Sequence, residues 1–139
     1  MEKPDIDRWL GAYVAAWKSY DRAQIEALFA DEVSYRYHPY DEPVRGRDAV
    51  VRAWLGEANA TGASTRDEPG TYDAAYAAVA TDGDIAVATG TTRYSPRPGA
   101  PPDRVFDNCF LMRFDSAGRC DEFTEWYMER PEPEALLAP

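Results

Sequence analysis

The residues best suited to chemistry lie in the segment Arg104–Glu129, which reads as two strands joined by a polar loop that ends in glycine. If Phe114 and Arg119 close that loop, Asn108 faces Glu125 across the two strands. The same register pairs Phe106 with Tyr127 and Phe110 with Phe123. Because side chains alternate across a sheet, these six share one face, which is apolar apart from an amide and a carboxyl group. A carboxyl buried there must be hydrogen-bonded or protonated, so Glu125 is predicted to be either a structural anchor or the acid–base group of a pocket.

Three other residues are candidates to assist Glu125 in proton transfer. Asn108 could polarise a ligand oxygen, or it could hold Glu125 in place. Tyr13, on the apolar face of a predicted helix, could donate a hydrogen bond to such an oxygen, or it could be an ordinary core residue. His38 is the only histidine and is therefore the natural second base near neutral pH, with a partly exposed loop residue as the alternative interpretation.

Aromatic side chains are predicted to form the walls of the cavity around these groups. Tyr35 and Tyr37 share one strand face, and they could either line the cavity or pack under a helix. The predicted ligand-binding residues are Trp17, Tyr35, Tyr37, Phe106, Phe110, Phe123 and Tyr127.

Three predicted helices and a set of strands must position these residues. The first helix begins near Pro4 and Asp5, and its apolar residues have the spacing of one helical face. Asp21 is predicted to cap a second, shorter helix, and Asp48 a third. Strands are predicted at residues 33–37, 72–80, 85–94, 104–114 and 119–129. The sequence therefore predicts an α+β fold, in which a curved, mostly antiparallel sheet closes over three helices.

The remaining stretches are predicted to be connections. Residues 95–102 carry four prolines, which a sheet cannot accommodate, and they lie close to Asn108 at the end of the sheet opposite the tight turns. Residues 59–70 are polar and predicted to form a loop. We expect a single domain over residues 1–139, with its core at about 6–129 and a C-terminal tail at 130–139.

The composition argues against several classes of function. A net charge of −10 with scattered basic residues argues against a nucleic-acid partner, and no apolar run is long enough to cross a membrane. One histidine and no cysteine–histidine spacing argue against a metal site, and no cofactor is expected. No export signal is visible, so we predict a cytoplasmic protein with free thiols at Cys109 and Cys120. The glycosylation sequon at Asn59 is then interpreted as a chance match.

Four segments carry a resemblance to a known family: YVAAWKSYD, ALFADEV, VRGRDAV and FDSAGRCDEFTEWY. With the order of elements around them, they resemble the nuclear transport factor 2-like superfamily, and its SnoaL-like branch most of all, from about Ile6 to Glu129. The resemblance implies a cone-shaped roll with a pocket for a small molecule. Members include polyketide cyclases, ketosteroid isomerases, epoxide hydrolases, dehydratases and proteins without catalytic activity, so the resemblance does not decide the function.

The catalytic residues of the ketosteroid isomerases are matched only in part. Tyr13 falls where those enzymes keep the tyrosine that donates to the substrate oxyanion. Their general-base aspartate is replaced by Tyr37, and their second oxyanion donor by Phe110. We therefore expect no ketosteroid isomerase activity.

The catalytic set of the epoxide hydrolases is also incomplete. Glu125 falls on one of its acidic positions, but the arginine and aspartate of an earlier strand are replaced by Gly90 and Thr92. We therefore expect no limonene-type epoxide hydrolase activity.

Two functions of different classes remain open. The first is an enzyme of the isomerase, cyclase, dehydratase or hydrolase type that acts without a cofactor on a small, largely apolar, oxygen-bearing molecule. In it Glu125 would move the proton while Tyr13 or Asn108 polarises an oxygen. The alternative is a non-catalytic ligand-binding or dimerisation module with the same fold.

The opposite face of the same hairpin predicts self-association. Cys109, Leu111, Trp126 and Met128 are expected to point away from Glu125. Such an apolar surface is unfavourable in water, so we expect a homodimer that pairs through the outer face of the sheet.

Overall fold

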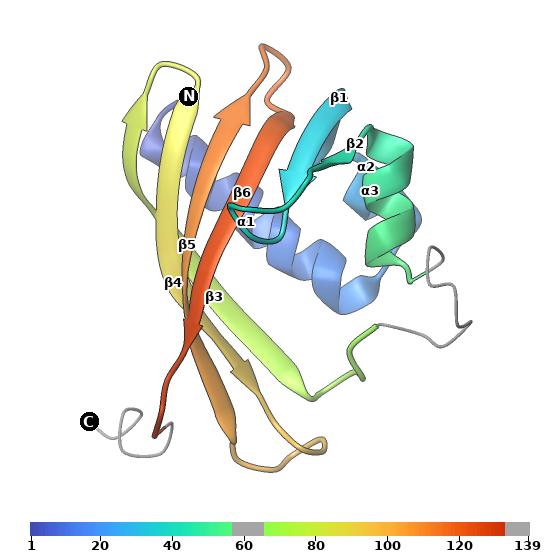
Figure 1. Ribbon diagram of the computed structural model, residues 1–139, viewed down its shortest axis with the longest axis vertical. Coiled ribbons are helices and arrows are strands. Elements are labelled where there is room, and N and C mark those ends of the chain that lie inside the picture. The colour runs from blue at the N-terminus through green and yellow to red at the C-terminus, as the bar shows by residue number, and fades with distance from the viewer. Residues whose placement is uncertain (57–65, 133–139) are drawn as a thin grey trace.

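The computed structural model describes residues 1–56 and 66–132 (Figure 1). Within these ranges the helices are α1 (Lys3–Ser19), α2 (Arg22–Glu26) and α3 (Arg47–Trp54). The strands are β1 (Phe29–Arg36), β2 (Val44–Arg45), β3 (Tyr72–Asp82), β4 (Ile85–Tyr94), β5 (Arg104–Phe114) and β6 (Cys120–Glu129). Most of the predicted loop 59–70, the sequon at Asn59 and residues 133–139 of the predicted tail lie outside the described residues.

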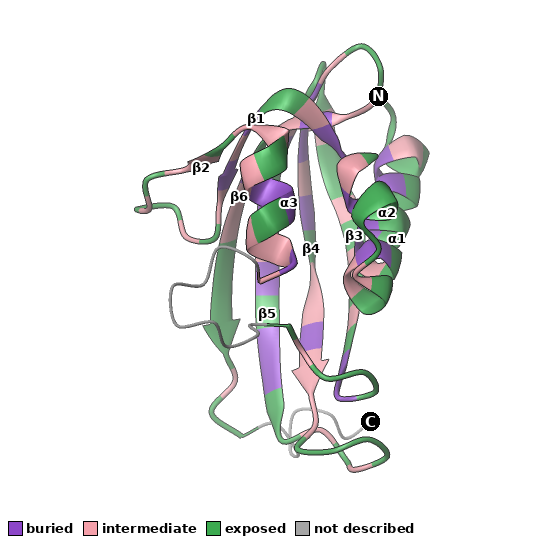
Figure 2. Ribbon diagram, turned by 90° about the vertical axis from the view of Figure 1, so that its right-hand side faces the viewer, coloured by how far each residue is buried: buried purple, intermediate pink, exposed green. Residues whose placement is uncertain are grey.

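The described strands form one curved sheet in the order β2-β1-β6-β5-β4-β3. Strand β1 runs parallel to β6, and every other neighbouring pair is antiparallel. The helices lie together against one face of this sheet, and the long strands β3–β6 extend past them at one end (Figures 1 and 2). The predicted α+β class and the mostly antiparallel sheet are confirmed.

Helix α1 supplies much of the core because its apolar residues fall on one face. The buried members are Ile6, Trp9, Leu10, Tyr13 and Ala16. The helix begins with a proline in its first turn and a reciprocal capping box between Glu2 and Asp5. The indole N–H of Trp9 donates to the Leu28 carbonyl at 3.0 Å, so this ring is buried without leaving its donor unpaired.

The starts of the two short helices were predicted with different success. Asp21 is confirmed as the N-cap of α2, since its carboxylate accepts the backbone N–H of Gln24 at 3.0 Å. The prediction that Asp48 caps the third helix is wrong, because α3 begins at Arg47 with Gly46 as its N-cap. Gly46 has a φ of 89°, which glycine adopts readily, and Asp48 lies in the first turn, where its charge interacts favourably with the helix dipole.

The register predicted for the β5–β6 hairpin is wrong by two residues. Instead of the predicted partners, Phe106 pairs with Glu129, Asn108 with Tyr127, Phe110 with Glu125 and Met112 with Phe123. One residue of the offset arises in the loop, which Asp115 and Arg119 close through an N–H···O hydrogen bond of 2.8 Å. The other arises from an irregularity at Asp121, which lies unpaired between the partners of Arg113 and Phe114. A shift of one residue would turn side chains to the other face of the sheet, but a total shift of two does not. Every side chain of this hairpin therefore keeps the face predicted for it.

The outward face of this hairpin and the cysteines also match their predicted positions. Leu111, Trp126 and Met128 are exposed, and both cysteines are free thiols, with Cys120 buried and Cys109 half-buried. Among the described residues, no helix has the length and apolarity needed to cross a bilayer.

Gly90 is required by the packing of a neighbouring tyrosine ring. It pairs with Tyr76 on β3 and with Asn108 on β5. A Cβ atom at this position would collide with the Ala75 carbonyl oxygen and would lie 2.6 Å from Cδ1 of Tyr76. The absent side chain leaves room for the Tyr76 ring, whose centroid lies 4.6 Å from that of Phe110.

We predict that Gly90→Ala lowers the free energy of unfolding by about 2 kcal/mol, because backbone and an aromatic ring must both shift to admit the methyl group. Gly11→Ala is the matched control, since a Cβ there meets nothing within 4 Å and the position is helical. The control should raise the free energy of unfolding by about 0.5–1 kcal/mol. Urea unfolding measures both changes, and an unaltered Gly90→Ala midpoint would contradict the packing argument.

Candidate functional site

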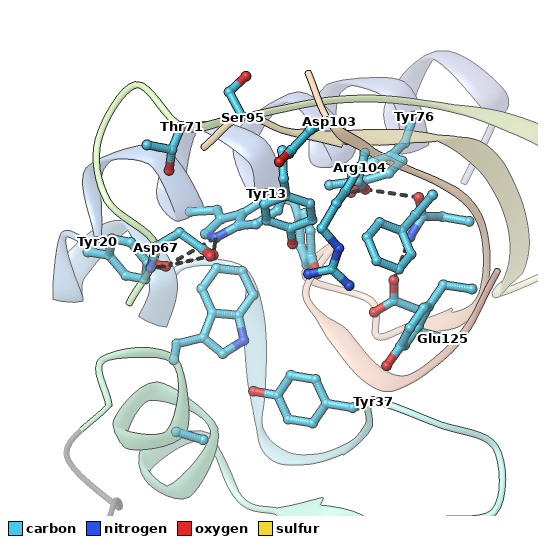
Figure 3. Close-up of a pocket in the computed structure, with 18 of the residues that line it drawn as sticks. Tyr13, Tyr20, Tyr37, Asp67, Thr71, Tyr76, Ser95, Asp103, Arg104 and Glu125 are labelled. Carbon is cyan, nitrogen blue, oxygen red and sulfur yellow. Dashed lines mark hydrogen bonds between the residues drawn. The ribbon is translucent and has the colours of Figure 1, made fainter. Parts of the chain in front are cut away.

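A cavity of about 770 Å³ lies between the helices and the sheet. Its lining comes from α1, α3, the strands β1 and β3–β6, and the proline-rich loop that follows β4. The aromatic members are Tyr13, Trp17, Tyr20, Tyr35, Tyr37, Trp54, Tyr76, Tyr94, Phe106 and Tyr127. Figure 3 shows Glu125 of β6, Tyr13 of α1 and Tyr37, from the segment after β1, extending into this space.

A chain of hydrogen bonds across four strands, β3 to β6, orients Glu125. The amide nitrogen of Asn108 donates to Oε2 of Glu125 at 2.7 Å. The amide oxygen of Asn108 accepts the hydroxyl of Thr92 at 2.9 Å, which fixes the orientation of the amide. Since the proton of Thr92 is used in this way, the phenol of Tyr76 must donate to Thr92, at 2.6 Å. Oε1 of Glu125 has no hydrogen-bond partner among the described residues.

Burial controls the protonation of Glu125. Removal from water raises the pKa of this carboxyl to about 7, while the hydrogen bond from Asn108 and the charge of His38 act in the opposite direction. Near neutral pH the carboxyl is therefore present in both protonation states, which suits a group that takes up and releases protons.

Two buried phenols lie together on the helical side of the cavity. The hydroxyl groups of Tyr13 and Tyr35 share a hydrogen bond of 3.0 Å. Burial raises the pKa of both phenols well above the ordinary value, so both keep their protons. One proton forms the shared bond, and the other has no acceptor in the described part of the chain.

Trp54 contributes a second unused donor next to these phenols. Its ring packs edge-on against Tyr13, with 5.0 Å between the ring centroids. Its indole N–H is buried and has no hydrogen-bond partner among the described residues. An unpaired buried donor costs about 1–3 kcal/mol, and a ligand oxygen in the cavity could remove that cost.

Charged groups gather at the other end of the cavity. The indole N–H of Trp17 lies 3.1 Å from both the carboxylate of Asp67 and the hydroxyl of Tyr20. Arg104 is held by two hydrogen bonds to Glu129, of 3.0 and 3.2 Å. The cavity thus has charged residues, Asp67 and Arg104, at one end and the aromatic residues Tyr13, Tyr35 and Trp54 at the other.

The structure places most of the predicted site residues on the cavity lining. The predicted residues found there are Tyr13, Trp17, Tyr35, Tyr37, Phe106, Asn108, Glu125 and Tyr127. Tyr37 lies one residue beyond the end of β1. Tyr40, next to this region, is 81% exposed and does not line the cavity.

Three predicted site residues are not part of the lining. Phe110 and Phe123 were expected as walls, but both are fully buried in the core beneath the cavity. Phe123 stacks on Tyr35 at 4.5 Å, and Phe110 lies 5.8 Å from Tyr13, so the two tyrosines separate these rings from the ligand space. His38 lies behind Tyr127, whose hydroxyl is 2.7 Å from Nε2 of the imidazole.

Several lining residues were missed by the sequence reasoning. They are Tyr20, Ala53, Trp54, Asp67, Thr71, Tyr76, Thr92, Tyr94, Ser95, Pro96, Asp103 and Arg104. Tyr76, Thr92 and Tyr94 could have been found from strand alternation, because they share the face of Asn108. The residues of the proline-rich loop could have been found from its predicted position near Asn108. Trp54 and Asp67 carry no such signal, because their neighbours come from distant parts of the chain.

Comparison with known proteins agrees with this geometry and defines the class of the protein. Residues 10–123 match the sequence model of the SnoaL-like domain. The chain therefore belongs to the SnoaL-like family, and its helices and curved sheet form the cone-shaped roll of nuclear transport factor 2-like proteins. No curated protein matches the chain in sequence.

Two solved structures illustrate the shared fold. One is an epoxide hydrolase from M. tuberculosis described as LEH-like, with a TM-score of 0.61, 16% identity, and coverage of 92% of this chain and 86% of the other. The second is a protein of unknown function with a cystatin-like fold from Methylobium petroleophilum PM1, with a TM-score of 0.60, 17% identity, and coverage of 99% and 84%. At these identities the likeness concerns the fold alone.

The raised pKa of Glu125 predicts a pH-dependent effect of Glu125→Gln on stability. In the folded state the carboxyl binds its proton more tightly than in the unfolded chain, where the pKa is near 4.5. Wild type therefore loses stability as the pH rises from about 4.5 to about 7, by up to about 3 kcal/mol, whereas the neutral amide does not.

Two measurements check this prediction. NMR titration of the Glu125 side-chain carboxyl should give a midpoint near 7. Urea unfolding should show Glu125→Gln gaining stability over wild type between pH 5 and pH 8. A midpoint at or below the ordinary glutamate value, with equal pH dependence of the two proteins, would identify Glu125 as a hydrogen-bonded structural anchor.

Proposed function

We propose that this SnoaL-like protein binds a small, largely apolar, oxygen-bearing molecule in the cavity and catalyses a proton transfer on it without a cofactor. The observation that carries the proposal is the part-buried carboxyl of Glu125, held by Asn108 at 2.7 Å at the wall of an aromatic cavity. A pKa of about 7 allows the group to give or take a proton near neutrality. The reaction type is isomerisation, cyclisation, dehydration or hydrolysis.

Hydrogen-bond donors without an acceptor among the described residues favour a ligand that carries an oxygen atom. The Tyr13–Tyr35 pair has one phenolic proton to offer, and Trp54 has an unpaired N–H beside it. Hydrogen bonds from these donors would stabilise negative charge that develops on a ligand oxygen while Glu125 moves a proton elsewhere on the molecule. The aromatic lining suits the apolar remainder of the ligand.

A non-catalytic ligand-binding module is the second candidate. It is favoured by the replacement of the known catalytic positions of two related enzyme groups by Tyr37, Phe110, Gly90 and Thr92. The same cavity would then hold a ligand without turning it over, and Glu125 would serve only to recognise it.

The exposed outer face of the sheet supports a homodimer. Trp126 is 43% exposed and Met128 77% exposed, next to Leu111 at 42%. These side chains belong to neighbouring strands, β5 and β6, and point away from the cavity. Covering them with a second copy would remove a contiguous apolar surface from water.

We also propose that the protein is cytoplasmic, since its free thiols suit a reducing compartment.

Proton transfer predicts a measurable isotope exchange on a simple ketone. We propose 2-tetralone as the probe, because it is a small bicyclic ketone whose α-hydrogens are replaced by deuterium in D₂O, as NMR detects. Wild type should accelerate the exchange, and Glu125→Gln should lose at least about 10²-fold of that acceleration. Glu122→Gln is the matched control, since this exposed carboxylate on the same strand pairs with Arg113 at 3.3 Å.

The indole N–H signals separate binding from catalysis in the same samples. Binding of 2-tetralone should shift the Trp54 signal, whereas that of Trp9, whose N–H is already bonded to Leu28, should stay in place. A Trp54 shift with no exchange above the Glu125→Gln rate would favour the non-catalytic module. If binding shifts no Trp54 signal and wild type does not accelerate the exchange, both functions are contradicted for ketones of this class.

Self-association is predicted to depend on Trp126. Trp126→Glu should give monomers in sedimentation experiments, because it would bury an unpaired charge in an interface of on the order of 800 Å² per partner. Tyr40→Glu introduces the same charge at an exposed residue outside the strands and should leave a dimer. A wild-type protein that sediments as a monomer at micromolar concentration would contradict the predicted homodimer.

A further inference from the structure

Beside the cavity, three side chains form a hydrogen-bonded row that ends in the solvent. Oδ2 of Asp41 lies 2.8 Å from Nδ1 of His38, and Nε2 of His38 lies 2.7 Å from the hydroxyl of Tyr127. Tyr127 lines the cavity and is itself 42% exposed, whereas His38 and Asp41 are not part of the lining and have about a third of each side chain exposed. The row therefore links the ligand space with bulk water.

The partners of the imidazole fix its tautomer when it is neutral. A carboxylate can only accept, so Nδ1 must carry the proton that is donated to Asp41. Nε2 then carries a lone pair and accepts the phenolic proton of Tyr127. Burial and the charge of Glu125 raise the pKa of Tyr127, so this phenol holds its proton at neutral pH.

Tyr127 and Glu125 line the same cavity from neighbouring positions. They lie two residues apart on β6, so their side chains point to one face of the sheet and their Cα atoms are about 7 Å apart.

We propose that Tyr127, His38 and Asp41 form a proton relay, in which Tyr127 is a second catalytic residue that removes a proton from the ligand. The phenol oxygen of Tyr127 takes a proton from an acidic O–H or C–H of the ligand while its own proton moves to Nε2 of His38. The ligand becomes an anion, His38 becomes an imidazolium, and Asp41 stabilises the new positive charge. His38 then releases the proton to water.

The relay rests on the proposed function of the cavity and adds a second group to it. Glu125 in its protonated form can return a proton at another position of the ligand, so that one group removes a proton and the other supplies one. That pairing fits an isomerisation, cyclisation or dehydration, and the relay selects ligands with an acidic proton next to the oxygen, such as phenols and enolisable ketones.

A purely structural role is the alternative for His38 and Asp41. The backbone N–H of Asp41 donates to the carbonyl of His38 at 3.1 Å, and Arg36 donates to the Asp41 carbonyl, so the turn has supports of its own. The titratable or charged groups around the imidazole are Asp41, Tyr127, Tyr40, which stacks on it at 5.1 Å, and Glu125 through its field. None of the backbone contacts requires an imidazole at this position.

The test uses 4-nitrophenol, whose phenol and phenolate forms differ in absorbance. His38 is the only histidine, so its ¹⁵N spectrum needs no assignment and reports both the tautomer and the imidazolium. At pH 7 the bound probe should ionise in wild type while His38 becomes an imidazolium in the same titration. The ratio of bound phenolate to phenol should fall about tenfold in His38→Gln and in Tyr127→Phe, the size expected for losing a hydrogen bond to a charged group.

Matched variants separate the relay from its surroundings. Tyr40→Phe removes a hydroxyl from the ring stacked on His38 and should leave the ratio unchanged. Glu125→Gln removes the carboxyl of the proposed function and should still allow phenolate and imidazolium to form together. Asp41→Ala removes the acceptor at Nδ1, so it should lower the ratio and should remove the preference for a proton on Nδ1.

Each result decides for or against the relay. Phenolate that forms without imidazolium, or a bound probe that stays protonated in wild type, would overturn it even if Glu125 is active. If 4-nitrophenol does not bind wild type at millimolar concentration, the proposed cavity function fails for this class of ligand. The free-protein ¹⁵N spectrum then decides alone: a proton on Nδ1 that is lost in Asp41→Ala supports the relay, and a proton on Nε2 overturns it.

Discussion

Burial of one carboxyl group beside aromatic rings is the constraint that organises this half of the molecule. Glu125 can remain at the cavity wall only because Asn108 donates to it, and Asn108 can donate only because Thr92 occupies its amide oxygen. Thr92 is held in turn by Tyr76, whose ring lies over the space left by Gly90. A single buried charge thus accounts for the residue types at successive positions on β3, β4 and β5.

The cavity exists because the sheet is longer than the layer of helices that covers it. Where the helices lie against the sheet, rings such as Phe110 and Phe123 close the core completely. Past the helices, the same strand faces carry Asn108 and Thr92, together with the lining residues Tyr76, Tyr94 and Tyr127. The boundary between the two regions falls at Tyr13 and Tyr35, which are packed like core residues yet line the cavity.

The sequence predicts the architecture well because local signals decide it. Amphipathic spacing and the Asp21 cap predict the first two helices, and strand alternation fixes which side chains face the cavity. The sequence does not predict the register of β5 against β6. The closing pair of the loop and the irregularity at Asp121 each shift that register by one residue, and neither is marked by a recognisable sequence pattern. The sequence also misses Trp54 and Asp67, whose place in the cavity depends on tertiary contacts between segments far apart in the chain. The predicted walls at Phe110 and Phe123 failed for a related reason, since alternation gives a face but not the depth at which a ring lies.

The departures from the related enzymes gain a physical interpretation from the hydrogen bonds. By the resemblance drawn from the sequence, Gly90 and Thr92 are expected to fall where the epoxide hydrolases have charged catalytic residues. In this structure Gly90 leaves room for Tyr76 and Thr92 hydrogen-bonds to it, so these strands orient Asn108 with neutral groups. With no ion partner supplied from β4, removal from water dominates and raises the pKa of Glu125 to about 7, although the hydrogen bond from Asn108 and the charge of His38 act in the opposite direction. An arginine beside it would keep the carboxylate ionised and unable to donate a proton at neutral pH. The neutral surroundings are therefore what make a single carboxyl able to act both as an acid and as a base.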